Sequence, residues 1–410
     1  MRYNFIPCLF CLVCVVLQQI QGKQLSCIDK IHCCSADSDI VWKSYDAFNR
    51  IFLDTVKGIY KTDTSFKGAE DRYNGAAAVW CQAIYWDMAM NAYKRAKAQQ
   101  NQRREVYMRK LCRLIFEGNK KHYAGFDFND NNENTGWFIY DDIMWWSISL
   151  ARAYELFGDA EYLKLAEESF ERVWHGSGKV GDTGSYDSEN GGMFWQWQPI
   201  QNPRPNKFGD GKMACINFPT VIAALTIHNG LIKTGQEDVC YLQKGKEIYA
   251  WATDYLFDSE IGKVADSQHG DCEPHWKAHL YNQATFIGAS VLLYQATGKR
   301  KYLDNACCAA DYVFDEMVSK QHILPFECGP EQGIYTAIFA QYIFSLIYDC
   351  HQTRYLAWME KNCLQGWLNR NPQNDICHGR FDVSTTDEVI DSYSASGLPA
   401  MLLLLPIRSR

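Results

Sequence analysis

The chain has 410 residues, of which 47% are hydrophobic, 14% aromatic and 22% charged. This composition supplies enough apolar surface for a folded core and excludes a disordered, collagen-like or low-complexity protein. The 41 Lys and Arg against 48 Asp and Glu give a net charge of −7, so neither a nucleic acid nor an anionic membrane surface is an expected partner. We expect one compact, aromatic-rich domain.

The N-terminal residues have the pattern of a secretory signal. Arg2 precedes an apolar run over residues 5–17, and a small residue, Gly22, follows shortly after. A short basic region, an apolar stretch and a small residue are typical of a signal peptide, and the run is too short for a transmembrane helix. The sequence therefore predicts a signal peptide over 1–22 and a secreted single domain over 23–410, with no membrane span after cleavage.

The cysteine count fits an oxidising compartment. The chain has 17 Cys, and three of them lie in the predicted signal, which leaves 17 − 3 = 14. An even number in a secreted protein suits several disulfides, although some of the cysteines can equally be buried thiols. The pairing cannot be deduced from the sequence.

After the signal, the chain reads as a series of helical hairpins. Apolar residues recur at helical spacing on both sides of Gly158, Gly235 and Gly298, and a glycine in the left-handed conformation commonly ends a helix. Helical periodicity predicts about twelve helices, and strand-like alternation is scarce. They are expected to start near Ser38, Gly75, Arg103, Asp141, Asp159, Asn217, Cys240, His279, Lys299, Glu331, Gln352 and Asp391.

A dozen helices in hairpins form either an open solenoid or a closed ring of inner and outer helices. The spacing of these hairpins is irregular and their loops are long and aromatic, which favours closure around a binding face. The predicted fold class is all-α.

Asp141 and Asp142 stand where a long loop becomes a helix. Aspartate at a helix start is often only a cap. At such a position, however, both side chains can project into one cleft, at about the separation of a retaining glycosidase pair. Repulsion should then keep one carboxyl protonated, while the helix terminus favours ionisation of the other. This predicts a catalytic pair for glycosidic bond cleavage.

The surrounding loops are rich in residues that bind sugars. Aromatic rings can stack on the apolar faces of sugar rings, and amides can bind hydroxyls, although each of these residues could instead belong to the core or cap a helix. Trp146 is assigned to the core. The candidate substrate-binding residues are Trp137, Tyr140, Trp145, Trp195, Trp197, Trp276, Asn282, Gln283, Asn74 and Asn217.

The motifs at these positions resemble glycoside hydrolase family 76, the α-1,6-mannanases and their fungal cell-wall relatives. They are YDDIMWWSISLA at 140–151, GGMFW at 191–195, YNQATFIGA at 281–289 and YQATG at 294–298, with a weaker match in VWCQAIYWD at 79–87. This resemblance implies an (α/α)6 barrel and endo-acting hydrolysis of α-1,6-linked mannan with retention. It also implies that Asp141 is the nucleophile and Asp142 the general acid/base.

Two alternatives stay open. Some fungal relatives in this family are thought to transfer glycosyl groups between wall polymers, which makes a transglycosylase the second hypothesis. The third is a non-catalytic carbohydrate-binding protein. This chain also departs from the family in its many cysteines, the Asn/Asp-rich segment before Trp137 and the loop over 199–211.

The sequence predicts no metal and no cofactor. The Asp127 segment is similar to a calcium loop but has Asn132 and Phe138 where such a loop needs Gly and Glu. His275 and His279 have zinc-ligand spacing without the accompanying Glu. The expected partner is a mannan-like polysaccharide or oligosaccharide, bound by a monomer.

Overall fold

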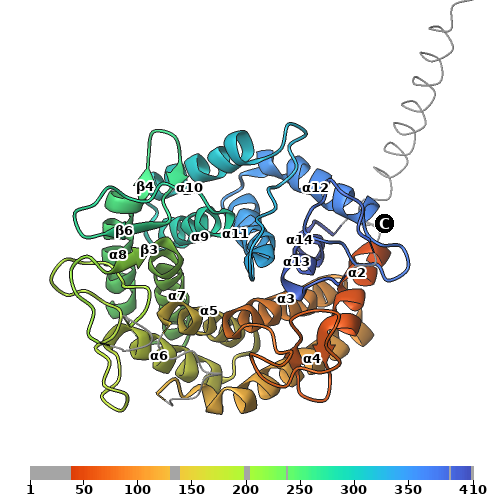
Figure 1. Ribbon diagram of the computed structural model, residues 1–410, viewed down its shortest axis with the longest axis horizontal. Helices are drawn as coiled ribbons and strands as arrows, with labels where there is room; N and C mark the ends of the chain where they lie inside the picture. The colour runs from red at the N-terminus through yellow and green to blue at the C-terminus, as the bar shows by residue number, and fades with distance from the viewer. Residues whose placement is uncertain (1–37, 130–138, 198–203, 237–238, 387–388, 408–410) are drawn as a thin grey trace, which may run out of the picture.

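The computed structural model describes residues 38–129, 139–197, 204–236, 239–386 and 389–407. Helices dominate these residues and are arranged as an inner and an outer ring around a common axis (Figure 1). The inner ring contains α3 (Val79–Ala98), α5 (Tyr140–Phe157), α7 (Ala214–Lys233), α9 (Leu280–Thr297), α11 (Tyr335–Asp349) and the pair α13 (Ser392–Ala395) and α14 (Gly397–Leu404). The outer ring contains α2 (Ser38–Phe52), α4 (Gln102–His122), α6 (Ala160–His175), α8 (Cys240–Leu256), α10 (Arg300–Tyr312) and α12 (Leu356–Leu368).

The order of packing closes the ring. Each inner helix packs against the next, from α3 through α5, α7, α9 and α11 to α14, and α14 returns to α3. Arg95 on α3 fastens this last contact, because its guanidinium Nη1 donates to the carbonyl oxygens of Leu403 at 3.1 Å and Leu405 at 2.6 Å. The predicted (α/α)6 barrel is confirmed.

Local sequence explains the hairpins. Gly158 ends α5 at φ 72° and Gly298 ends α9 at φ 67°, both in the left-handed region that glycine adopts without strain. Asp159 then caps α6, since its side chain accepts from the amide of Glu161 at 3.1 Å. The predicted glycine turns after α5 and α9 therefore match the structure.

Several predicted helix starts are displaced. α3 begins at Val79 rather than near Gly75, because residues 76 and 77 pair with the backbone around β2 instead. α7 begins at Ala214, one turn before Asn217. The predicted starts near Glu331 and Gln352 first form short 3₁₀ turns, η3 (Gln332–Ile334) and η4 (Thr353–Tyr355), before α11 and α12.

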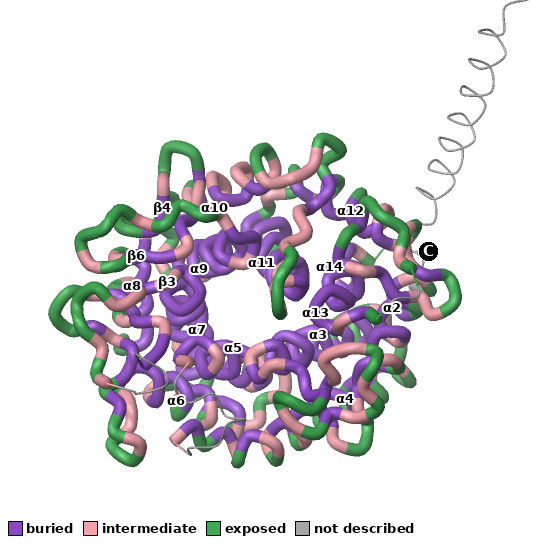
Figure 2. The backbone as a smooth tube through the Cα atoms, in the orientation of Figure 1, coloured by how far each residue is buried: buried purple, intermediate pink, exposed green. Residues whose placement is uncertain are grey.

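Burial separates the two rings. The inner helices are buried on nearly all sides, whereas the outer helices bury one face and expose the other (Figure 2). An outer helix therefore shows a clear apolar stripe, and an inner helix does not. Trp146 on α5 is fully buried and its indole Nε1 donates to the Val79 carbonyl at 2.9 Å, as its predicted core role requires.

The remaining elements are short. Three antiparallel pairs are formed by β1 (Leu53–Asp54) with β2 (Ile59–Tyr60), β3 (Gly211–Met213) with β6 (Ser267–His269), and β4 (Phe257–Asp258) with β5 (Lys263–Val264). Two further turns are η1 (Ala124–Phe126) and the π-helical η2 (Val313–Met317). The β3–β6 pair matters for the site, because the amide of Trp195 donates to the Gly211 carbonyl at 3.0 Å.

Two predictions from the sequence, the signal peptide and the disulfides, concern the cellular compartment of the protein. The predicted signal peptide lies outside the described residues. Every cysteine in the described part of the chain is a free thiol, and many of them are buried among apolar side chains, so the expected disulfides are not seen there.

Among the described helices, α7 is long and apolar enough to cross a membrane, but 83% of the apolar stretch is buried inside the ring.

Candidate active site

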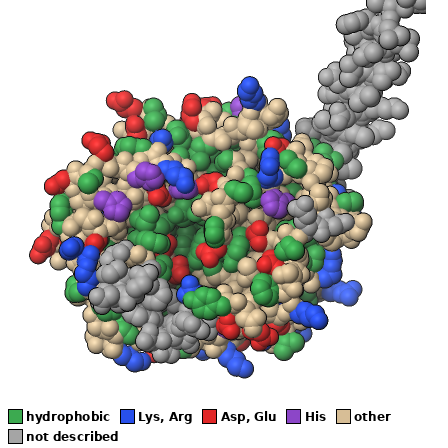
Figure 3. Space-filling model, in the orientation of Figure 1, with side chains coloured by type: hydrophobic (Ala, Val, Ile, Leu, Met, Phe, Trp, Pro, Cys, Tyr) green, Lys and Arg blue, Asp and Glu red, His purple; other side chains and the backbone are tan. Residues whose placement is uncertain are grey.

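The starts of four inner helices meet around one cavity of about 560 Å³. Its wall includes Val79 at the start of α3, Asp142 at the start of α5, Glu331 just before η3 and Asp391, which caps α13. Figure 3 shows the face of the ring hollowed at its centre, with acidic and apolar side chains inside the hollow. A cavity of this volume has room for a ligand of several sugar units only if it continues into open solvent, as a cleft does.

Asp142 lies in this cavity and is held in its protonated form. Burial raises the pKa of the Asp142 carboxyl well above its usual range, and the neighbouring charges of Asp141 and Glu331 raise this pKa further. Arg72, on the opposite wall, lowers the pKa by a smaller amount. A buried carboxylic acid that keeps its proton near neutral pH is suited to donate that proton to a leaving group.

Asp141 does not line the cavity itself but contacts Trp195, which does. It is 9% exposed, and its Oδ1 accepts from the Trp195 indole Nε1 at 2.9 Å. Burial raises the pKa of Asp141 to about 7, although hydrogen bonds from the Cys215 thiol, the Trp195 indole and the backbone lower this pKa. These donors favour the carboxylate of Asp141, so it ionises more readily than Asp142.

The structure corrects the predicted electrostatics in two respects. The sequence predicted that both side chains project into the cleft, but only Asp142 is among the residues that line the cavity. It also predicted that repulsion is the main cause of the raised pKa, whereas burial contributes most for both carboxyls. The predicted order, with one acid protonated and its neighbour more easily ionised, agrees with the structure.

A third carboxylate, Glu331, forms the opposite wall. It has φ 67°, a left-handed conformation that is unusual for a non-glycine residue, and its Oε2 accepts from the Trp80 indole Nε1 at 2.7 Å. The Trp80 ring in turn packs 6.0 Å from the Trp145 ring. Glu331 is thereby held by Trp80 near the start of α3, and it lines the same cavity as Asp142.

Tyr140 positions the pair rather than binding substrate. It is fully buried, and its hydroxyl donates to Asp182 Oδ2 at 2.9 Å. The same carboxylate accepts from Arg172 Nη1 at 2.8 Å. The prediction of a sugar contact for Tyr140 is therefore wrong, because this hydroxyl is used to anchor the start of α5 to α6.

The aromatic residues predicted to bind substrate have different surroundings in the structure. Trp195 lines the cavity, as predicted. Trp145 and Trp197 are 1% and 6% exposed and belong to the core, so they do not offer a free face to a sugar. Trp276 is exposed but is not part of the cavity wall. Trp137 lies outside the described residues.

The predicted amide contacts are mostly structural. Asn217 accepts from the Met193 amide at 2.8 Å and donates to the Met193 and Met213 carbonyls, which holds the segment that carries Trp195. Gln283 is fully buried, and its side chain bonds to backbone groups of Gly262, of Val264 in β5 and of Ala309 in α10. These two amides correct the prediction, since their polar atoms already have protein partners.

The other two predicted amide residues, Asn282 and Asn74, differ in their burial. Asn282 is fully buried and its Nδ2 donates to Asp266 Oδ1 at 3.2 Å, while its side-chain Oδ1 has no partner among the described residues. Asn74 is exposed in a turn next to Arg72 and Tyr73, and it is those two residues that line the cavity. Neither asparagine is part of the cavity wall.

The histidines singled out for zinc spacing have other roles. His279 is buried and pairs through Nδ1 with Glu327. His275 is exposed, and its Nδ1 lies 3.7 Å from Asp266. Across the described segments, no group of three or more His, Cys, Asp or Glu side chains is placed to hold a metal ion.

Several cavity residues were missed by the sequence analysis. They are Arg72, Tyr73, Trp80, Glu331, Asp391 and Tyr393. The sequence does contain a signal for these residues, because most of them lie within a few residues of the predicted start of an inner helix.

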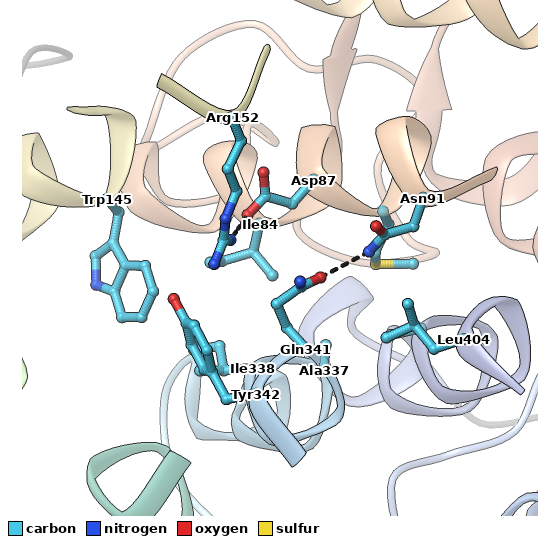
Figure 4. Close-up of a pocket in the computed structure, with 12 residues that line it drawn as sticks. Ile84, Asp87, Asn91, Trp145, Arg152, Ala337, Ile338, Gln341, Tyr342 and Leu404 are labelled. Carbon is cyan, nitrogen blue, oxygen red and sulfur yellow. Dashed lines mark hydrogen bonds and ion pairs between the residues drawn. The ribbon is translucent and has the colours of Figure 1, made fainter. Parts of the chain in front are cut away.

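The ring axis is closed below the site. A pocket of only about 20 Å³ remains there, with room for about one water molecule. Figure 4 shows what fills this region: Arg152 pairs with Asp87, and Asn91 donates to Gln341 at 2.7 Å. Among the described residues, the side chains around this pocket leave no room for a sugar ring.

An (α/α)6 ring with an acidic cavity at its centre, and two neighbouring buried carboxyls beside it, is an arrangement suited to glycosidic bond cleavage. The sequence profile of glycosyl hydrolase family 76 matches residues 44–397, and the chain belongs to that family. No curated protein sequence matches the chain.

Solved structures of this family have the same fold. The GH76A α-1,6-mannanase from Salegentibacter sp. HEL1_6 superposes with a TM-score of 0.71 at 23% identity, covering 89% of this chain and 98% of that chain. The family 76 mannosidase Bt3792 from Bacteroides thetaiotaomicron gives 0.70 at 17% identity, covering 89% and 96%. Dfg5 from Chaetomium thermophilum, solved with glucosamine, gives 0.67 at 14% identity, covering 90% of each chain.

Proposed function

We propose that this family 76 glycoside hydrolase is secreted and cleaves α-1,6-mannosidic bonds within mannan, with retention of anomeric configuration. The observation that carries the proposal is the Asp141–Asp142 pair, in which Asp142 opens into the cavity as an acid and Asp141 is surrounded by donors. The Salegentibacter enzyme supports the choice of substrate, because its inactive form with two adjacent aspartates changed to asparagine was solved with α-1,6-mannotriose.

The proposed reaction has two steps. In the first, the Asp141 carboxylate attacks the anomeric carbon, the bond to the glycosidic oxygen breaks, and Asp142 gives its proton to that oxygen. In the second, Asp142 takes a proton from water, the water oxygen bonds to the anomeric carbon, and Asp141 leaves as a carboxylate. The Trp195 indole N–H, 2.9 Å from Asp141, stabilises the negative charge that returns to this carboxylate.

The rest of the cavity suits a chain of neutral sugars. Trp195, Tyr73 and Trp80 offer aromatic surface, and Glu331 and Asp391 offer acceptors for sugar hydroxyls. The wall carries the carboxylates of Glu331 and Asp391 against one arginine, Arg72, which disfavours an anionic glycan, since like charges repel. A neutral hexose polymer fits this wall better than a uronate or a phosphorylated sugar does.

The first prediction tests the pair directly. Asp141→Asn and Asp142→Asn should each lower the rate of α-1,6-mannan hydrolysis by at least about 10⁴-fold, because each removes one of two obligatory groups. Reducing-end release measures the rate, and product NMR at early times reports the anomer. The matched control is Asp254→Asn on the outer helix α8, which is exposed and should keep full activity. Near-full activity in either site variant would refute the assignment.

Transfer to a sugar acceptor is the second candidate, and the shared fold with Dfg5 favours testing it. The chemistry differs only in the second step, where an acceptor hydroxyl replaces water. Incubation with excess mannose oligosaccharide separates the two: longer products indicate transfer, and only shorter ones indicate hydrolysis. Retention of glycan without any new product would instead indicate a binding protein.

Secretion is part of the proposal and rests on the N-terminal pattern around residues 5–22. Expression in a eukaryotic secretory host should release a protein into the medium whose N-terminus follows Gly22. Mass spectrometry of the released protein reports this N-terminus. Retention in the cytosol with Met1 intact would contradict it.

A further inference from the structure

A second cavity, of about 300 Å³, lies outside the ring opening. It is bounded by the end of α8, by the loop that carries Phe208 and by the β3–β6 pair, which lie side by side in Figure 1. Of the residues that the structure describes, none lines both this cavity and the catalytic one. The two are nevertheless linked, since Gly211 at the start of β3 accepts from the Trp195 amide, and Trp195 contacts Asp141.

The wall of this second cavity carries an aromatic platform. Trp251 and Tyr255, one turn apart on α8, stack with ring centroids 5.0 Å apart and an interplanar angle of 27°. Tyr255 and, across the cavity, Phe208 are 46% and 55% exposed. Gly192 packs closely against one face of the Trp251 ring, because a Cβ at this glycine would lie 2.5 Å from the ring. This contact holds Trp251 in place. Rigid aromatic surface that stays open to solvent is what an apolar sugar face stacks on.

The polar groups of this wall include a hydrogen-bond acceptor for the hydroxyl groups of a ligand. Gln268 is 5% exposed, and its Nε2 donates to the Gly270 and Cys272 carbonyls at 2.6 and 2.7 Å. Its Oε1, in contrast, is enclosed and has no hydrogen-bond partner among the described residues. A buried amide oxygen without a donor costs free energy, which a ligand hydroxyl recovers when the Gln268 side chain turns toward the cavity.

Charge in the second cavity argues against an anionic ligand. The ammonium of Lys212 is already bound to Asp187 Oδ2 at 2.7 Å, and Arg204 is paired with Asp210. Asp271 adds an exposed carboxylate to the same wall. With its cations neutralised and an acid present, the cavity suits a neutral ligand with many hydroxyls rather than a phosphate or a sulfate.

We propose that the cavity between Tyr255, Phe208 and Gln268 is a second carbohydrate site, which binds a neutral hexose unit of the glycan outside the catalytic cleft. This proposal rests on the proposed function for the identity of the sugar, mannose. Such a site raises the affinity for a polymer, because one chain can occupy both sites, but it has no effect on a substrate too short to reach it.

The test compares a polymer with a short substrate. In the full chain carrying Asp141→Asn, Tyr255→Ala should weaken retention by α-mannan in affinity electrophoresis about 3- to 10-fold, which is the range for loss of one aromatic contact. In the chain with both aspartates intact, Tyr255→Ala should leave turnover of α-1,6-mannotriose unchanged. Phe208→Ala is a second variant with the same expectation. Tyr107→Ala on α4, 54% exposed, is the matched control and should change neither measurement.

Each outcome decides the inference. Unchanged retention in both the Tyr255→Ala and Phe208→Ala proteins would overturn it, and so would a loss of mannotriose turnover equal to the loss of retention, because the residues would then serve the catalytic cleft. Neither result touches the proposed function, which depends on cleavage by the unaltered chain. Conversely, absence of cleavage alongside Tyr255-dependent retention would reject the catalytic proposal and leave the second site standing.

Discussion

At the scale of single residues, the active site consists of acids that the fold keeps out of water. Transfer of a carboxylate from water into a buried site is unfavourable, so each acid holds its proton to higher pH. Among the described residues, Arg72 is the one cation that lowers the pKa of Asp142, and it opposes the effect of burial only in part. The same burial that prepares an acid for catalysis must therefore reduce the stability of the folded chain at alkaline pH.

Asp142→Asn should stabilise the protein, and more so as pH rises. Because the folded pKa of Asp142 is raised, its favourable contribution is complete below the unfolded pKa, about 4, and is lost as pH rises through the folded value. Asparagine resembles the protonated acid at every pH. Thermal unfolding should show a Tm gain of a few degrees at pH 8 and little or none at pH 4. An equal gain at both pH values would contradict this account.

Glu331→Gln should move the alkaline limb of the pH–rate profile to lower pH. The groups that face Asp142 are Asp141, Glu331 and Arg72, and removal of the Glu331 charge leaves less repulsion, which lowers the pKa of the acid. Glutamine still provides an acceptor for the Trp80 indole. The profile of kcat/KM should shift by roughly 1 pH unit or less. Glu189→Gln, at an exposed position, is the control, and an unchanged alkaline limb in Glu331→Gln would refute the role.

At the scale of helices, the inner ring requires small residues where neighbours cross. A Cβ at Gly288 on α9 would lie 2.2 Å from the Tyr342 ring on α11. Tyr342 cannot simply turn away, because it is buried and its ring lies beside Arg152 in the interior of the barrel (Figure 4). Helix propensity alone would favour alanine over glycine at this position, so packing and propensity make opposite predictions.

Gly288→Ala should destabilise the fold by about 1–2 kcal/mol, since overpacking exceeds the gain of about 1 kcal/mol in helix propensity. Gly245→Ala on the outer helix α8 is the matched control. Its new Cβ would meet nothing closer than 3.5 Å, so it should stabilise by up to about 1 kcal/mol. Urea unfolding measures both. Equal effects at the two sites would show that crossing distance does not limit the inner ring.

At the scale of the whole molecule, stability depends on closing the ring. The last inner helix, α14, packs against α3, α2 and α11, and so joins the two ends of the chain. Arg95 reaches from α3 to the final carbonyls of α14, which lie more than 300 residues away in sequence. These carbonyls have no partner within their own helix, so the guanidinium replaces the missing amides.

Arg95→Met should lower the free energy of unfolding by about 2–4 kcal/mol, because two charge-assisted hydrogen bonds are lost and the carbonyls stay buried. Lys97→Met, on the exposed side of the same helix, should change stability by no more than about 0.5 kcal/mol. Urea unfolding of both variants should retain one transition. An Arg95→Met protein as stable as Lys97→Met would show that this contact does not close the ring.

The sequence alone determined the features that depend on neighbouring residues. Helical periodicity and the glycines after α5 and α9 identified the hairpins, since a helix and its stop signal are local. The position of Asp141 and Asp142 at a helix start was likewise visible, because both residues belong to the first turn of α5.

Only the tertiary structure decided which side chains reach the cavity and how the acids ionise. Asp142, Glu331 and Asp391 are far apart in sequence and meet only because the inner helices start on one face of the ring. Gln283 and Asn217 look like sugar ligands in sequence, yet distant backbone groups occupy their amides. Burial is set by everything that packs around a residue, and most of that lies far away along the chain.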